Sequence, residues 1–236
     1  MERHVEPELL DELPAVDPSA AGSRDDINRL NGWMGSATTM ARALRSVAPG
    51  RGRRRLVDLG ASDGRFLLRV AHRLAGDWAG TEAVLVDHQD VVRLETRDAF
   101  ERLGWRIAVV KSDVFDWLRG PVVQPLDAVV ANLFLHHFSA ARVKKLLAAV
   151  AERTGTFVAV EPCRSAWAYA ASRLVWAIGC NAVTRHDAPV SVQAGFAGDE
   201  LSRLWPADGT WHLAERRAGS FGHLFAARKR QANSVG

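Results

Sequence analysis

The sequence predicts an α/β protein built on a doubly wound, mostly parallel sheet. Short runs rich in β-branched residues recur between turn signals, and helical patterns fill the gaps between them. The first five runs lack polar/apolar alternation, which is typical of parallel strands buried on both faces. The last two runs are separated by only three residues, which is too few for a crossover helix, so they predict an antiparallel hairpin.

The length and composition are those of one globular domain with appendages. Of the 236 residues, 47% are hydrophobic and 25% are charged, which excludes wholesale disorder, collagen and coiled-coil rods. The net charge of +4 is too small to indicate a nucleic-acid-binding protein. The two cysteines, Cys163 and Cys180, exclude a disulfide framework and are expected to be buried apolar groups.

The N-terminal region predicts an arm followed by a helical cap. Residues 1–22 are rich in proline and acids and show no periodicity, so they predict a flexible arm. They hold no apolar core of the kind that a secretory signal has. Ser23 has the character of an N-cap, and residues 23–50 predict two helices that end at Pro49-Gly50.

The central region predicts five strands of a parallel sheet. Their ranges are 54–60, 83–88, 106–113, 126–134 and 156–162. The clearest helix between them is 139–152, which Ser139 caps and which carries apolar residues at every third or fourth position. A further helix at about 199–204 precedes the two hairpin strands, 211–218 and 222–229.

A charged glycine loop follows the first strand. Residues 58–64 read DLGASDG, a spacing that differs from the G-x-G-x-x-G of dinucleotide-binding loops. Asp58 and Asp63 would repel a pyrophosphate and suit a ligand that carries positive charge and no phosphate. S-adenosylmethionine (SAM), with a sulfonium and an ammonium group, is such a ligand. At the tips of the next two strands, Asp87 is placed to accept from ribose hydroxyls and Asp113 to hold an adenine amino group.

These segments resemble those of the class I SAM-dependent methyltransferases of the small-molecule type. The matching segments are VDLGASDG at 57–64, VDH at 86–88, SDVFD at 112–116 and DAVVANLFLHHF at 127–138, together with the terminal hairpin. The resemblance implies a seven-stranded sheet of order 3-2-1-4-5-7-6 with strand seven antiparallel. It implies a SAM-binding domain over 51–230, with a substrate-side insertion at about 163–198 and a tail at 231–236.

The resemblance also implies a cofactor site at the carboxyl ends of the first and fourth strands. Its residues are Asp58, Gly60, Ala61, Ser62, Gly64, Asp87, His88, Asp113, Val114, Asn132 and Leu133. Ser62 stands where the family usually has glycine, and we expect it to adopt the turn and donate a hydrogen bond. Asp113 could equally cap the following helix. The family further implies that residues 23–50 fold over the cofactor as a lid.

Two histidines after the fourth strand are the candidates for catalysis. If strands four and five are parallel neighbours, His136 and His137 lie near Glu161. A histidine beside a carboxylate is suited to general-base catalysis, because the carboxylate orients the imidazole and stabilises its protonated form. O-methyltransferases with a similar LHH segment use the first histidine in this way, so His136 is the expected base. Packing of His136 against SAM is the alternative, and His137 and His186 remain open as the base.

The segment after strand five is where the family usually builds its acceptor site. We expect a helix over 164–179 and a polar cluster at 185–187 to contribute to that site. The expected substrate-binding residues are Trp33, Trp167, Tyr169, Arg185 and His186. The tryptophans and the tyrosine indicate an apolar, aromatic acceptor.

The expected function is SAM-dependent methyl transfer to a small aromatic or polyketide-like acceptor of secondary metabolism, most simply O-methylation. The alternatives are C- or N-methylation of a quinone-like ring, a nucleic-acid methyltransferase, and a non-catalytic partner protein with this fold. We expect a small-molecule acceptor, no nucleic acid and no metal cofactor. The sequence leaves the oligomeric state open, and a homodimer is one alternative. The longest apolar stretch, 166–179, is shorter than the ~20 residues that cross a bilayer, so we expect a cytoplasmic protein without a membrane span.

Overall fold

Seven strands form one sheet in the computed structural model, which describes residues 1–121 and 125–230. The strands are β1 (Arg55–Leu59), β2 (Glu82–Asp87), β3 (Arg106–Lys111), β4 (Ala128–Asn132), β5 (Thr156–Pro162), β6 (Trp211–Ala218) and β7 (Gly222–Lys229). Their order across the sheet is β3-β2-β1-β4-β5-β7-β6, and β7 runs antiparallel to both of its neighbours. The predicted order and the predicted hairpin are thereby confirmed. The tail predicted at 231–236 lies outside the described residues.

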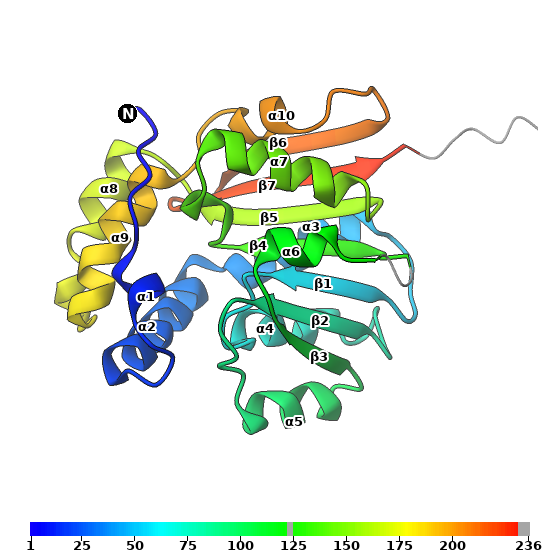
Figure 1. Ribbon diagram of the computed structural model, residues 1–236, viewed down its shortest axis with the longest axis horizontal. Coiled ribbons are helices and arrows are strands. Elements are labelled where there is room, and N and C mark those ends of the chain that lie inside the picture. The colour runs from blue at the N-terminus through cyan, green and yellow to red at the C-terminus, as the bar shows by residue number, and fades with distance from the viewer. Residues whose placement is uncertain (122–124, 231–236) are drawn as a thin grey trace, which may run out of the picture.

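Helices cover both faces of the sheet (Figure 1). One face is covered by α3 (Ser36–Val47), α4 (Arg65–Leu74) and α5 (Leu94–Arg102), and the other by α6 (Val114–Arg119), α7 (Ala140–Ala151) and α10 (Glu200–Leu204). Successive strand residues enter opposite cores: Leu56 of β1 packs with α3 and α4, whereas Val57 packs with α6 and α7. A strand buried on both faces has no polar side, which explains the unbroken apolar runs in the sequence.

The start of the second helix differs from its prediction. α1 (Leu9–Glu12) is a single turn, and α2 runs from Pro18 to Met34. The predicted N-cap at Ser23 is wrong, because Asp17 caps the helix by accepting hydrogen bonds from two backbone N–H groups of the first turn. Asp followed by Pro at the first helical position is a strong start signal. Ser23 lies inside α2 and is buried.

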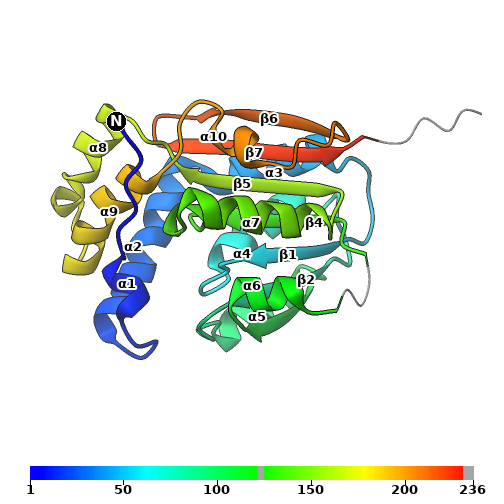
Figure 2. The same cartoon turned by 45° about the horizontal axis from the view of Figure 1, so that its top comes forward.

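A lobe of helices lies beyond the carboxyl ends of the parallel strands (Figures 1 and 2). It consists of α1, α2, α8 (Ala166–Ser172), the 3-10 helix η2 (Val175–Ile178) and α9 (Ala182–Ala194). The single helix predicted over 164–179 is wrong: α8 ends where the Ser172 hydroxyl donates to the Tyr169 carbonyl, and a 3-10 turn follows. None of the helices in the described ranges combines the length and the apolar character that crossing a membrane requires.

Candidate active site

A polar cavity of about 520 Å³ lies at the carboxyl ends of β1, β2 and β4. The lobe contributes Arg24, Ile27 and Asn28 of α2 to its lining. The predicted cofactor residues that line it are Asp58, Gly60, Ala61, Ser62, Asp87, His88, Asp113, Val114, Asn132 and Leu133. Gly64 does not line it: this residue is the N-cap of α4, where φ of +74° favours glycine.

The loop after β1 approaches the cavity with its backbone. Gly60 has φ of +71°, and a Cβ atom there would lie 2.2 Å from a ring carbon of Phe134, so no larger residue fits. Ser62 has φ of +49°, and its backbone N–H donates to Asp87 Oδ2 over 2.8 Å. Ser62 therefore adopts the turn in the left-handed conformation, and the hydrogen bond it donates comes from the backbone.

Asp87 at the end of β2 is held in its ionised form. Burial alone would raise the pKa of this carboxyl, but hydrogen bonds from His88 and from the backbone N–H groups of Gln89 and Ser62 lower the pKa below its usual range. The same contact with Asp87 raises the pKa of His88. Asp113 both lines the polar cavity and caps α6, since its Oδ1 accepts from two N–H groups of that helix.

Asp58 and Asn132 present acceptor atoms that lack a donor within the described part of the chain. Burial, and then the neighbouring Asp87 carboxylate, raise the pKa of Asp58 to about 8. The Asn132 side-chain oxygen is buried and accepts no hydrogen bond from the described residues. A buried carboxyl beside a second carboxylate and an unpaired amide oxygen together suit a ligand that brings positive charge and N–H donors.

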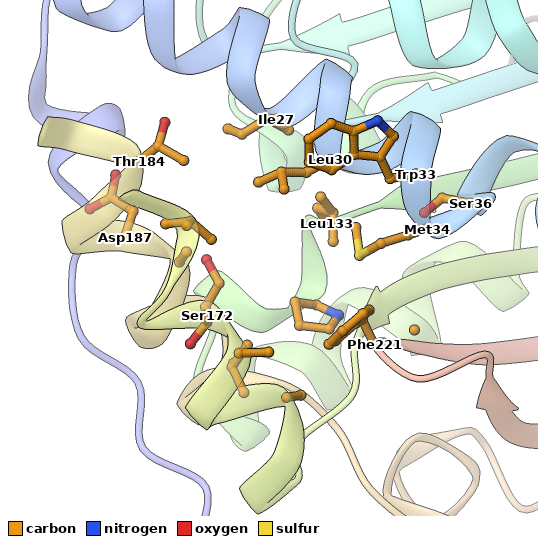
Figure 3. Close-up of a pocket in the computed structure, with 18 of the residues that line it drawn as sticks. Ile27, Leu30, Trp33, Met34, Ser36, Leu133, Ser172, Thr184, Asp187 and Phe221 are labelled. Carbon is orange, nitrogen blue, oxygen red and sulfur yellow. The ribbon is translucent and has the colours of Figure 1, made fainter. Parts of the chain in front are cut away.

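An apolar cavity of about 440 Å³ lies beside the polar one, between α2, α8, η2 and α9. Figure 3 shows Leu30, Trp33 and Met34 of α2 facing Leu133 and Phe221. The two cavities share the lining residues Glu8, Ile27, Leu133 and Ser191. The cavities therefore meet at the end of β4, where Leu133 adopts φ of +51°. This conformation is rare for leucine and is typical of functional sites.

The predicted substrate residues divide between the apolar cavity and the surface. Trp33 lines the cavity, whereas Trp167, Tyr169, Arg185 and His186 are not among its lining residues. α8 turns its small buried side chains to the cavity and leaves Trp167 exposed. The polar cluster expected at 185–187 lies on α9 and is also split between the cavity and the surface. Asp187 lines the cavity, whereas Arg185 and His186 are exposed.

Glu161 on β5 organises the turn after β4. Its buried carboxylate accepts hydrogen bonds from the backbone N–H groups of Phe134 and Leu135, over 3.1 Å and 2.9 Å. Its Oε2 lies 2.8 Å from Nδ1 of His136. The structure thus places His136 beside Glu161. Both residues are buried, and His136 lines the polar cavity while Glu161 lines the apolar one.

Glu8 is a site residue that the sequence analysis missed. Its Oε1 lies 3.2 Å from Nε2 of His136, and the Ser191 hydroxyl donates to the same oxygen. Burial alone would lower the pKa of His136, but its contacts with Glu161 and Glu8 raise the pKa to about 9. Both nitrogens of His136 therefore face carboxylates. No local signal in the acid-rich N-terminus distinguishes Glu8 from its neighbours Glu2 and Glu6.

The ring of His137 lies against that of His136, with centroids 4.2 Å apart and a tilt of 34° between the planes, and Nδ1 of His137 lies 3.0 Å from Asp11 Oδ2. Glu8, His136 and His137 each present a potential ligand atom, and these atoms lie within 4.8 Å of one another. These residues could hold a metal ion, so the expectation that the chain uses no metal remains a prediction.

Solved structures share this fold. The methyltransferase domain of bacterial CtHen1-C is 16% identical at a TM-score of 0.56, over 84% of this chain and 98% of that one. Magnesium protoporphyrin IX methyltransferase (ChlM) from Synechocystis PCC 6803 was solved with bound SAM. It is 10% identical to this chain at a TM-score of 0.53, and the match covers 94% of this chain and 88% of ChlM. The pyocyanin biosynthetic protein PhzM is 17% identical at 0.54, over 91% of this chain but only 59% of PhzM. No protein-family model and no curated protein matches the chain.

The sheet order and these likenesses define the fold as that of the class I SAM-dependent methyltransferases. At identities below one fifth, the likeness concerns the fold, and the activity has to be argued from the site.

Proposed function

We propose that the chain transfers a methyl group from SAM to a small apolar acceptor. The observation that carries this proposal is the junction of two unlike cavities: one polar and lined by acids, the other mainly apolar, meeting at Glu8 and Leu133. A methyl transferase needs this arrangement because the donor and the acceptor must meet in line across a short gap.

SAM fits the polar cavity by charge and by hydrogen bonding. Its ammonium group would supply the positive charge and the N–H donors that Asp58 and Asn132 lack. Asp87, ionised and at the tip of β2, would accept from the ribose hydroxyls, and Asp113 would receive the adenine amino group. A nicotinamide dinucleotide would instead bring its pyrophosphate to a loop flanked by Asp58 and Asp63, where like charges repel.

We infer that the acceptor reacts through a hydroxyl group, so the reaction is O-methylation. Bound SAM supplies an electrophilic methyl group; the carbon–sulfur bond breaks with its electron pair on sulfur while an oxygen–carbon bond forms. Burial alone would raise the pKa of Glu8, but its contacts with His136 and neighbouring groups lower it to about 2. The hydroxyl proton becomes strongly acidic as the oxygen–carbon bond forms, so even this weakly basic carboxylate takes it. Glu8 is the carboxylate that reaches both cavities.

In this scheme His136 and Glu161 are positioning residues. His136 was expected as the base, but its Nδ1 faces Glu161 and its Nε2 faces Glu8, and its raised pKa keeps it protonated at neutral pH. The protonated imidazole holds the Glu8 carboxylate at the junction of the cavities. Ser191 donates to the same carboxylate and leaves its second oxygen for the acceptor.

A turnover assay on apolar phenols tests the proposal. The full chain is incubated with SAM and a panel of uncharged phenols, and the release of S-adenosylhomocysteine is measured together with the mass of the product. The expected result is a product heavier by one methylene unit for at least one phenol. SAM binding without turnover on any acceptor in the panel would favour the non-catalytic partner protein.

A further inference from the structure

Exposed apolar side chains surround the mouth of the apolar cavity. Trp33 of α2 and Leu174, next to η2, are 63% and 58% exposed, although both also line the cavity. Ile178 also lines the cavity and is partly exposed. Trp176, which lies between Leu174 and Ile178 in the sequence, is 60% exposed. We call these four residues the apolar rim. They make the apolar surface continuous from the inside of the cavity to the outside of the lobe.

The segment that carries Leu174, Trp176 and Ile178 has exposed charge of one sign. The sequence from Cys163 to His186 contains no Asp and no Glu, and its exposed charged residues are Arg173 and Arg185. The nearest acids that follow or face this stretch, Asp187 and Asp26, are buried. An exposed surface of Trp, Leu, Ile and Arg without carboxylates is complementary to an anionic lipid surface, where tryptophan lies at the headgroup level and arginine meets phosphate.

Exposed apolar patches around a cavity mouth mark interaction sites rather than ordinary surface. A lipid surface matches both features of this face, because its interior receives apolar side chains and its anionic headgroups pair with Arg173 and Arg185. A membrane also contains the kind of acceptor that the apolar cavity fits, because an apolar molecule large enough to fill about 440 Å³ partitions into membranes rather than water.

We propose that the apolar rim docks on anionic membranes and that the chain takes a lipophilic, membrane-dissolved acceptor directly from them. The acceptor part of this inference rests on the proposed methyl transfer, whereas the docking does not. The docking is peripheral, by insertion of Leu174, Trp176 and their neighbours into the interface, and the cavity mouth then faces the lipid.

Vesicle sedimentation tests the docking. The full chain is pelleted with vesicles of phosphatidylcholine, or of phosphatidylcholine mixed with phosphatidylglycerol, and the bound fraction is measured. We expect binding to the mixed vesicles. The double variant Leu174→Ser/Trp176→Ser should bind at least about tenfold more weakly, because two side chains no longer insert. Arg173→Glu should weaken binding about tenfold and only on the anionic vesicles.

A matched control is Leu94→Ser, which removes an exposed leucine on α5, at the β3 edge of the sheet. This variant should sediment like the unaltered chain. The inference is overturned if the unaltered chain stays in solution, if the double variant sediments as well as the control, or if light scattering shows that the double variant turns a dimer into a monomer. SAM titration separates a failure of the docking from a failure of the proposed function. If the unaltered chain does not bind SAM, the proposed methyl transfer is contradicted, but the vesicle result still decides the docking.

Discussion

The Asp58 carboxyl is buried near the Asp87 carboxylate, and this pair suits the cationic ligand that we propose for the polar cavity. Without a ligand, burial and the neighbouring negative charge favour the protonated form of Asp58, and its pKa rises to about 8. A bound ammonium group reverses that preference. Binding of a cationic ligand should therefore release a proton at neutral pH, and affinity and pH become linked.

The affinity for SAM should rise with pH from about pH 6 toward pH 8, above which the ammonium group of SAM begins to lose its own proton. Below pH 8, Asp58 must lose a proton when SAM binds, which costs up to a factor of ten in affinity per pH unit. Calorimetric titration at several pH values, in two buffers of different ionisation enthalpy, measures the affinity and the released proton. Asp58→Asn should bind SAM more weakly and lose this pH dependence. An affinity of the unaltered chain that is flat from pH 6 to pH 9 would contradict the assignment.

Glu8 is the residue on which the proposed chemistry depends. Glu8→Gln keeps the shape of the side chain and a hydrogen bond to His136, but the amide cannot take a proton. We expect the variant to bind SAM normally and to lose roughly 10²–10⁴ in kcat. The control is Glu6→Gln, an exposed glutamate on the same segment that pairs with His4. Equal kcat values for the two variants would show that positioning alone drives the reaction.

The N-terminal segment before α2 forms a wall of both cavities rather than a detached arm. Arg3 donates to the carbonyl oxygens of His136 and Phe138, over 3.2 Å and 2.9 Å. Asp187 on α9 accepts from the N–H groups of Leu9 and Leu10, over 2.9 Å and 3.0 Å. These contacts hold Glu8 at the junction, so the position of the proposed base depends on the docking of a whole segment.

Removing the Asp187 anchor should loosen this segment. Asp187→Ala leaves the amides of Leu9 and Leu10 without a charged acceptor, a loss of ~1.5–3 kcal/mol per hydrogen bond. Hydrogen exchange at these two amides should become about 10- to 100-fold faster, while exchange in the sheet should not change. Arg185→Ala, an exposed position on the same helix, serves as the control. Unchanged protection of the two amides would show that the other contacts hold the segment alone.

The sheet could be predicted from the sequence because its signals are local. Apolar runs bounded by turn residues place β1 to β5 within one or two residues at each end, and the three-residue gap between β6 and β7 predicts their hairpin. The strand order came from the family resemblance. The loop positions of the cofactor site follow from the same pattern, since they lie at strand ends.

The candidate catalytic and acceptor sites could be predicted only in part, because they depend on contacts between distant segments. Glu8 and His136 are far apart in the chain, and no sequence feature near Glu8 predicts its contact with His136. The predicted acceptor residues on 164–179 follow from a continuous helix, whereas the break after Ser172 turns Leu174 and Ile178 to the cavity in their place. Packing, which a single sequence does not reveal, decided which side of each helix faces inward.

Calorimetric titration of the full chain with SAM and S-adenosylhomocysteine, with NADH as the comparison ligand, tests the central claim most directly. We expect micromolar dissociation constants for both adenosyl ligands and no binding of NADH. Asp87→Ala should weaken SAM binding roughly 10- to 100-fold by removing a charged hydrogen bond, whereas Asp90→Ala, an exposed carboxylate three residues further on, should not. Failure of the unaltered chain to bind SAM, or equal affinities of the two variants, would contradict the account.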